Sequence, residues 1–304
     1  MAQPRGRRTT AEHTNEDERG PWATEATDLV RAASGGLLFG IPLLYTMEIW
    51  WIGAHTSPLQ TASVLGLTAV PLYLLNKTSG FRSKGTVRVR DAAMDTIEAV
   101  ALGLVLVTIV LVLLREITGA TPLNEALAKV VYEALPFCLG IGVANHFLRS
   151  GRDAGDDDTD DDSGDSGDDE ADTSLHATLA DLGATSIGAV FIALNIAPTD
   201  EVPMLVTAMT TPWILALVAT SILTSYGIVF VAGFAGQDRR HSQVGVFQSP
   251  VTETIASYLV ALAFAALMLA LFQRLEGPRS LMLEQVVVLG FPAAIGGAAG
   301  RLAI

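Results

Sequence analysis

The chain has 304 residues, of which 50% are hydrophobic and 17% are charged, and its formal net charge is −13. This apolar composition is typical of a membrane protein and excludes a basic nucleic-acid-binding domain. Twelve of the 32 acidic residues lie between Asp153 and Asp172, and the remaining 20 nearly balance the 19 Lys and Arg residues. The single cysteine, Cys138, excludes an intramolecular disulfide and a cysteine-based metal centre.

Eight apolar stretches predict an all-α polytopic membrane protein. A spanning helix needs about 20 mostly apolar residues, because no water satisfies the backbone in the bilayer core. The predicted spans are 29–53, 59–76, 93–114, 126–148, 176–197, 210–235, 252–273 and 281–302. The first 28 residues are polar and mixed in charge, which predicts a disordered tail rather than a cleaved signal peptide.

The Lys and Arg residues are divided unequally between the two ends of these spans. Fifteen of the 19 fall on the side that carries both termini, and four fall on the opposite side. Loops rich in Lys and Arg stay in the cytoplasm. We therefore expect a multi-pass protein of the cell membrane with both termini and the acidic segment in the cytoplasm.

Landmark residues of the first four spans recur in the last four. At an offset of 153 residues, Gly35 recurs as Gly188, Glu48 as Glu201 and Tyr73 as Tyr226. Later pairs keep the same order, with Asp95 and Glu253 158 residues apart and Gly140 and Gly296 156 residues apart. This pattern predicts two tandem four-helix repeats. Because each repeat has an even number of helices, the second enters the membrane from the same side as the first, so the two repeats are parallel. The alternative is two halves that are merely similar in hydrophobicity.

The repeat and the acidic segment together define four regions. Asp, Gly and Ser dominate the segment between the halves, and like-charge repulsion predicts that it is disordered. It lacks the ligand order of a calcium-binding EF-hand loop. The predicted regions are a cytoplasmic tail 1–28, a first membrane repeat 29–149, an Asp-rich cytoplasmic linker 150–174 and a second membrane repeat 175–304.

Ionisable residues at the outer ends of the spans are the first candidates for function, because such residues are costly in a membrane. Glu48 and Glu201 are repeat partners, and Asp200 precedes Glu201. Across the repeat interface these carboxylates could bind or relay a small inorganic cation. The alternative is that each one only reaches the headgroup region beside Trp50 and Trp51.

A second acidic set lies at the inner ends of the third and seventh spans. Asp95, Glu98 and Glu253 could close an inner gate on the same cation path. Acidic residues in the first turn of a helix are also stabilised by the helix dipole, which is a sufficient explanation for these positions.

The remaining polar and small residues within the spans are assigned structural roles. Glu125, Lys129 and Glu133 share one helix face, and Lys129 with Glu133 is predicted to form a structural ion pair. The glycines spaced by four predict close helix packing, at Gly36, Gly40, Gly296 and Gly300. No histidine pair has metal-ligand spacing, so we expect neither a metal nor a cofactor.

Two runs resemble a known family. Pro42 to Trp51 reads PLLYTMEIWW, and Asn195 to Glu201 reads NIAPTDE. The chain is similar in these runs to a family of uncharacterised integral membrane proteins of archaea and bacteria, a domain of unknown function. The resemblance implies a membrane protein and carries no activity that could be transferred.

The leading hypothesis is a small secondary transporter or channel for a cation, and a homo-oligomer is left open. The alternative is a membrane scaffold or sensor whose acidic linker binds basic partners. Deleting residues 153–172 would separate the two, since only the scaffold would lose its partner. An enzyme is not predicted, because the phosphate-loop, H-E-x-x-H and G-x-S-x-G motifs are absent and paired acids alone specify no reaction.

Overall fold

The computed structural model describes residues 21–78, 89–153, 170–232 and 249–302. Every regular element within these ranges is helical, in agreement with the predicted all-α class. The elements are α1 (Pro21–Leu44), α2 (Met47–Ala54), α3 (Pro58–Thr78), α4 (Val89–Leu113), α5 (Leu123–Asp153), α6 (Glu170–Ile196), α7 (Glu201–Ala208), α8 (Thr211–Tyr226), the π-helix η3 (Gly227–Val231), α10 (Pro250–Leu271) and α11 (Arg279–Leu302).

Six helices in the described ranges are long and apolar enough to cross a membrane. A seventh span is obtained if α6 and α7, which are bent by 88° at the break between them, are counted as one. The apolar part of α3, Pro58–Leu74, is shorter than the others. The prediction of eight spans is therefore met in part: all eight stretches form helices, but not all have the length of a span.

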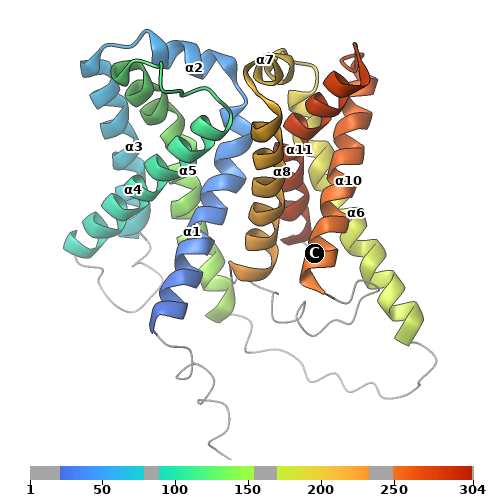
Figure 1. Cartoon of the computed structure of the whole chain (residues 1–304). Coiled ribbons are helices and arrows are strands. Elements are labelled where there is room, and N and C mark those ends of the chain that lie inside the picture. The colour runs from blue at the N-terminus through green and yellow to red at the C-terminus, as the bar shows by residue number, and fades with distance from the viewer. Residues whose placement is uncertain (1–20, 79–88, 154–169, 233–248, 303–304) are drawn as a thin grey trace, which may run out of the picture.

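The predicted first span, 29–53, is broken after Leu44. The backbone of Thr46 is extended, with φ −127° and ψ 103°, and α2 begins at the next residue. Pro42 lies in the last turn of α1, where it removes a backbone N–H donor from the helix. In the second half α7 follows α6 after a similar short break, and α2 and α7 lie at the same end of the bundle (Figure 1). We call this end the α2–α7 end.

The start of α1 and the end of α11 lie at the opposite end, the termini end (Figure 1). α1 begins at Pro21, inside the range predicted as a disordered tail. α5 continues to Asp153 and α6 begins at Glu170, so helices extend into both ends of the predicted linker 150–174. The rest of the predicted tail and linker, residues 1–20 and 154–169, lies outside the described ranges.

Each half contains one pair of closely crossing helices, α1 with α5 and α6 with α11. A Cβ atom on Gly35 would lie 2.6 Å from the carbonyl oxygen of Gly140. A Cβ atom on Gly188 would overlap the carbonyl oxygen of Gly296. Small residues at these crossings let the helix backbones approach closely, which is a main source of packing energy in a membrane.

Contacts between the halves occur at both ends of the bundle. At the α2–α7 end the hydroxyl of Tyr45 donates a hydrogen bond of 2.9 Å to the carbonyl oxygen of Val288. Toward the termini end, Nε of Arg31 donates one of 2.8 Å to the carbonyl oxygen of Ala232. The two halves are thereby held as one helical bundle.

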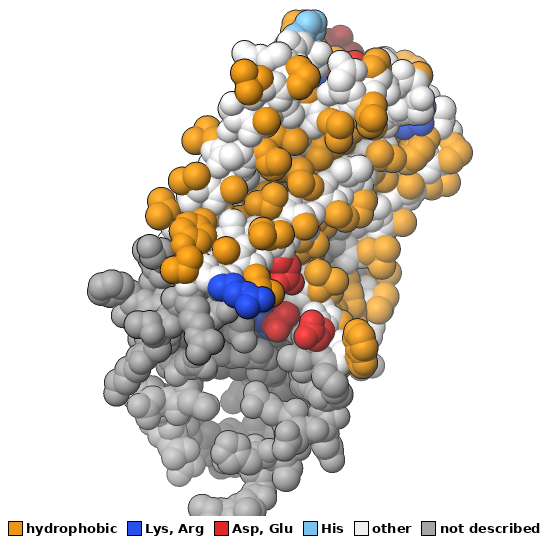
Figure 2. Space-filling model, turned by 90° about the vertical axis from the view of Figure 1, so that its left-hand side faces the viewer, with side chains coloured by type: hydrophobic (Ala, Val, Ile, Leu, Met, Phe, Trp, Pro, Cys, Tyr) orange, Lys and Arg blue, Asp and Glu red, His pale blue; other side chains and the backbone are white. Residues whose placement is uncertain are grey.

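Large hydrophobic side chains are exposed along α3 and α4, including Leu67, Val70, Ile97, Val105 and Ile109. Figure 2 shows this side of the molecule, on which hydrophobic side chains extend over most of the described surface. Such a continuous apolar surface is unusual for a soluble monomer and is suited to contact with lipid.

Candidate functional site

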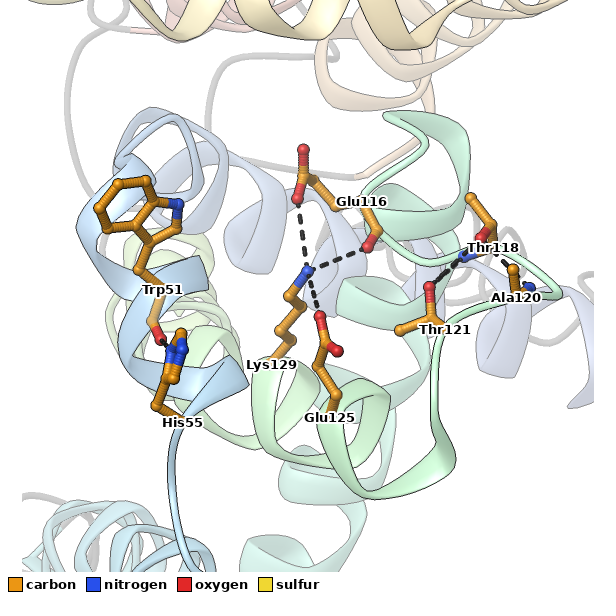
Figure 3. Close-up of polar contacts among 8 residues, drawn as sticks. All are labelled: Trp51, His55, Glu116, Thr118, Ala120, Thr121, Glu125 and Lys129. Carbon is orange, nitrogen blue, oxygen red and sulfur yellow. Dashed lines mark hydrogen bonds and ion pairs between the residues drawn. The ribbon is translucent and has the colours of Figure 1, made fainter.

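The most concentrated group of charges near the α2–α7 end surrounds Lys129. Its Nζ atom lies 3.0 Å from Oε1 of Glu125 and 3.6 Å from Oε2 of Glu116. The same ammonium group donates a hydrogen bond of 3.3 Å to the backbone carbonyl of Glu116. Figure 3 shows the three oxygen atoms converging on Nζ, and we call this group the Lys129 cage.

The end of α4 places Glu116 over Lys129. Arg115 adopts a left-handed conformation, with φ 68°, which ends the helix and reverses the chain. The N–H of Glu116 then donates to the carbonyl oxygen of Leu111 at 2.9 Å. Burial raises the pKa of the Glu116 carboxyl above its usual value, and the neighbouring Lys129 opposes this rise.

The predicted ion pair between Lys129 and Glu133 is wrong. Lys129 pairs with Glu125, one turn before it on the same helix, and with Glu116. Helical side chains lean toward the N-terminus of their helix, so a lysine reaches the carboxylate four residues before it more readily than the one four residues after it. Sequence spacing alone did not distinguish these two partners.

Glu133 is instead a fully buried carboxyl group near the middle of the membrane span Leu123–Ala144. Neither of its carboxylate oxygens has a hydrogen-bond partner among the described residues. The indole N–H of Trp50 lies close to this carboxyl group, but its geometry is not that of a hydrogen bond. Its central position in an apolar span was the signal in the sequence that could have identified it.

The short helix α2 closes this site from one side. Trp50 is 1% exposed, and its helix packs so closely on α5 that a Cβ atom on Gly53 would lie 3.0 Å from Cα of Lys129. The close approach of the two backbones explains how α2 can cover Glu133. Solvent is thereby kept from the middle of α5.

The three predicted outer carboxylates have different surroundings. Glu48 is exposed, whereas Glu201 is buried and its Oε1 accepts a hydrogen bond of 3.4 Å from the backbone N–H of Met47. Met47 begins α2, so the Glu201 carboxylate lies at a helix N-terminus, where the peptide dipoles favour a negative charge. Asp200 forms a separate ion pair of 2.7 Å with Arg274.

The predicted inner carboxylates are also separated. Asp95 and Glu98 are exposed on α4, whereas Glu253 is on α10, and these helices lie on opposite sides of the molecule (Figure 1). Acidic and basic side chains gather at the lower edge of the apolar face in Figure 2. In α4, Asp95 and Glu98 come just before the uncharged stretch that follows Glu98, as expected of charges at a membrane boundary.

Glu253 belongs to a second charged group, at the termini end of the second half. It forms an ion pair with Arg301, which is 1% exposed and also lies 3.5 Å from Asp181. The guanidinium group stacks over the ring of Phe230 at 5.5 Å. Arg301 was not among the predicted site residues, although a lone arginine late in an apolar helix is a signal of a buried partner. The adjacent cavity of about 10 Å³ has room for about one water molecule.

The four predicted packing glycines lie at helix contacts. Cβ atoms on Gly36 and Gly40 would meet Ile141 and Phe137 of α5, and those on Gly296 and Gly300 would meet backbone oxygens of α6. In the part of the chain that the structure describes, no group of three His, Cys, Asp or Glu side chains could hold a metal ion.

A family described as "Putative integral membrane protein (DUF2391)" matches residues 28–304. The matched range contains most of α1 and all the helices from α2 to α11. No curated protein and no solved structure matches the chain. The chain therefore belongs to this family of integral membrane proteins.

Proposed function

We propose that the protein is a secondary transporter for a small cation, in which the Glu133 carboxyl group binds the cation or a proton within the membrane. The observation that carries this proposal is a fully buried carboxyl group near the middle of a span without a hydrogen-bond partner in the described structure. An isolated carboxylate costs far more to bury than a carboxylic acid. The arrangement therefore suits a group that is protonated when closed and exchanges its proton for a cation when opened.

The Lys129 cage supports the same proposal. It lies one helical turn from Glu133 toward the α2–α7 end, and Glu116 is close enough to Glu133 to interact with its charge. Two carboxylates beside one ammonium group give the cage a net negative charge, which attracts cations. Glu201 at the same end would add to this attraction, whereas Asp200 is paired with Arg274 and Glu253 with Arg301.

We further propose that the helices form two tandem parallel repeats that together cross the membrane eight times. The order of a long helix, a short helix and three further long helical segments is the same in α1 to α5 and in α6 to α11. The close crossings pair Gly35 with Gly140 and Gly188 with Gly296, at the offsets noted in the sequence. The excess of Lys and Arg at the termini end supports a cytoplasmic location for that end.

The repeats have diverged in their buried charges. At an offset of 156, Lys129 corresponds to Gln285 and Glu133 to the buried Leu289. Of the buried charged residues that the structure describes, Lys129 and Glu133 thus have no ionisable counterpart in the second half. This asymmetry favours one cation site in the first half over a symmetric pair of sites between the halves.

Replacement of Glu133 by glutamine is expected to abolish cation-dependent flux while leaving the protein folded, because the amide keeps the shape and cannot exchange a proton. The measurement is uptake of protons, sodium, potassium and calcium by proteoliposomes that contain the full chain. Glu48→Gln is the matched control, since Glu48 is exposed and its amide should retain flux. Normal flux in Glu133→Gln with lost flux in Glu48→Gln would reject Glu133 and restore the paired outer carboxylates as the site.

A further inference from the structure

The ammonium group of Lys129 occupies a position that resembles a metal site. Two carboxylates and a backbone carbonyl place three oxygen atoms around Nζ, at 3.0 to 3.6 Å. Carboxylate and carbonyl oxygens are the ligands that proteins use for calcium and related cations. The side chain thus places a tethered positive charge where a free cation would otherwise bind (Figure 3).

We propose that Lys129 determines cation valence, by filling the cage so that the protein accepts monovalent cations and excludes divalent ones. That Lys129 selects the transported cation rests on the proposed function. Whether Lys129 keeps divalent cations from binding can be tested without transport. Glu116 and Glu125 carry two negative charges and Lys129 carries one positive charge, so the cage has a net charge of −1. One monovalent cation balances it, but a divalent cation would leave an excess positive charge in a partly buried site.

The position of the lysine is fixed by the surrounding helices. Lys129 is 8% exposed, and the α2 backbone at Gly53 packs directly against its own backbone. The carboxylates are also held: Glu125 shares a helix with the lysine, and the left-handed Arg115 directs Glu116 toward it. No cation can therefore take the position of Nζ unless the ammonium group leaves it, so a monovalent cation attracted by the net charge of −1 would lie beside the cage.

Removing the ammonium group is expected to create a divalent site. In Lys129→Gln the cage has a net charge of −2, with two carboxylates and a carbonyl that water molecules can complete as calcium ligands. Thermal unfolding of the purified full chain would be followed with millimolar calcium chloride and with sodium chloride at equal ionic strength. We expect calcium to raise the Tm of Lys129→Gln by about 2–4 °C relative to sodium, and to leave the wild type unchanged.

Two further variants control this experiment. Lys129→Arg keeps the positive charge and should show no calcium-specific shift. Lys129→Gln with Glu125→Gln returns the net charge to −1 and should lose the shift. A calcium-specific shift in the wild type of the same size, or none in Lys129→Gln, would overturn the proposal.

The wild type supplies a second test if Lys129→Gln does not fold. Wild-type proteoliposomes that exchange sodium or potassium and exclude calcium support the selectivity, and wild-type calcium uptake overturns it. Persistent flux in Glu133→Gln would reject the transport route through Glu133. The effect of calcium on the Tm of Lys129→Gln does not depend on that result. Failure of the proposed transport function and failure of the proposed role of Lys129 can therefore be told apart.

Discussion

Replacement of Gly188 by alanine is expected to force α6 away from α11 and to lower the free energy of unfolding by about 3 kcal/mol, the upper end for an added methyl group in a packed interior. The new Cβ atom would overlap the carbonyl oxygen of Gly296 and lie 3.1 Å from the backbone nitrogen of Gly300. Both are backbone atoms of a helix, so no side chain can rotate to make room. The measurement is unfolding of the purified protein in mixed detergent micelles with increasing denaturing detergent.

Gly183→Ala is the matched control, five residues earlier on the same helix. Gly183 is exposed, and a Cβ atom there would meet nothing within 4 Å. Alanine favours a helix over glycine, so this variant should be more stable by about 0.5–1 kcal/mol. Equal effects of the two substitutions would show that α6 and α11 do not cross at Gly188.

These glycines show how far the sequence could predict the fold. Gly35 with Gly188 and Gly140 with Gly296 were recognisable as matching positions, because glycine at a fixed offset in apolar sequence is informative. The sequence could not show that Gly35 contacts Gly140, since contacts between distant helices depend on their crossing angles. The break after Leu44 was missed, because Tyr45 continues the apolar pattern without a glycine or a charge. The predicted span 176–197, in contrast, ended within one residue of the end of α6.

The candidate site was predictable only in part: three of its charged residues were identified, but Glu116 and the pairing of the charges were not. Glu125, Lys129 and Glu133 were correctly placed on one helix. Their partners depend on two features from elsewhere in the chain, the left-handed turn that brings Glu116 to the lysine and the packing of α2 over Glu133. Neither feature leaves a periodic pattern. Spacing along one helix therefore identified the chemical groups and assigned the wrong ion pair.

The second large effect is expected from Arg301→Met, which removes the charge and keeps an apolar side chain of similar length. Arg301 is 1% exposed and pairs with Glu253 and Asp181, whose side chains are 25% and 21% exposed. Removing one partner of a buried ion pair leaves the other charges uncompensated. We expect a loss of about 3 kcal/mol, the lower end of the range for such pairs, because both carboxylates keep some contact with solvent.

Arg274→Met is the comparison that separates this loss from the removal of any arginine. Arg274 pairs with Asp200 at 2.7 Å, but the two side chains are 35% and 75% exposed, so its removal should cost less than about 1 kcal/mol. Adding Glu253→Gln to Arg301→Met should recover part of the stability, because one unpaired carboxylate is then removed. If Arg301→Met were as stable as Arg274→Met, the buried pair would not stabilise the termini end. The presence of the buried Arg301 at the termini end would then need an explanation other than protein stability.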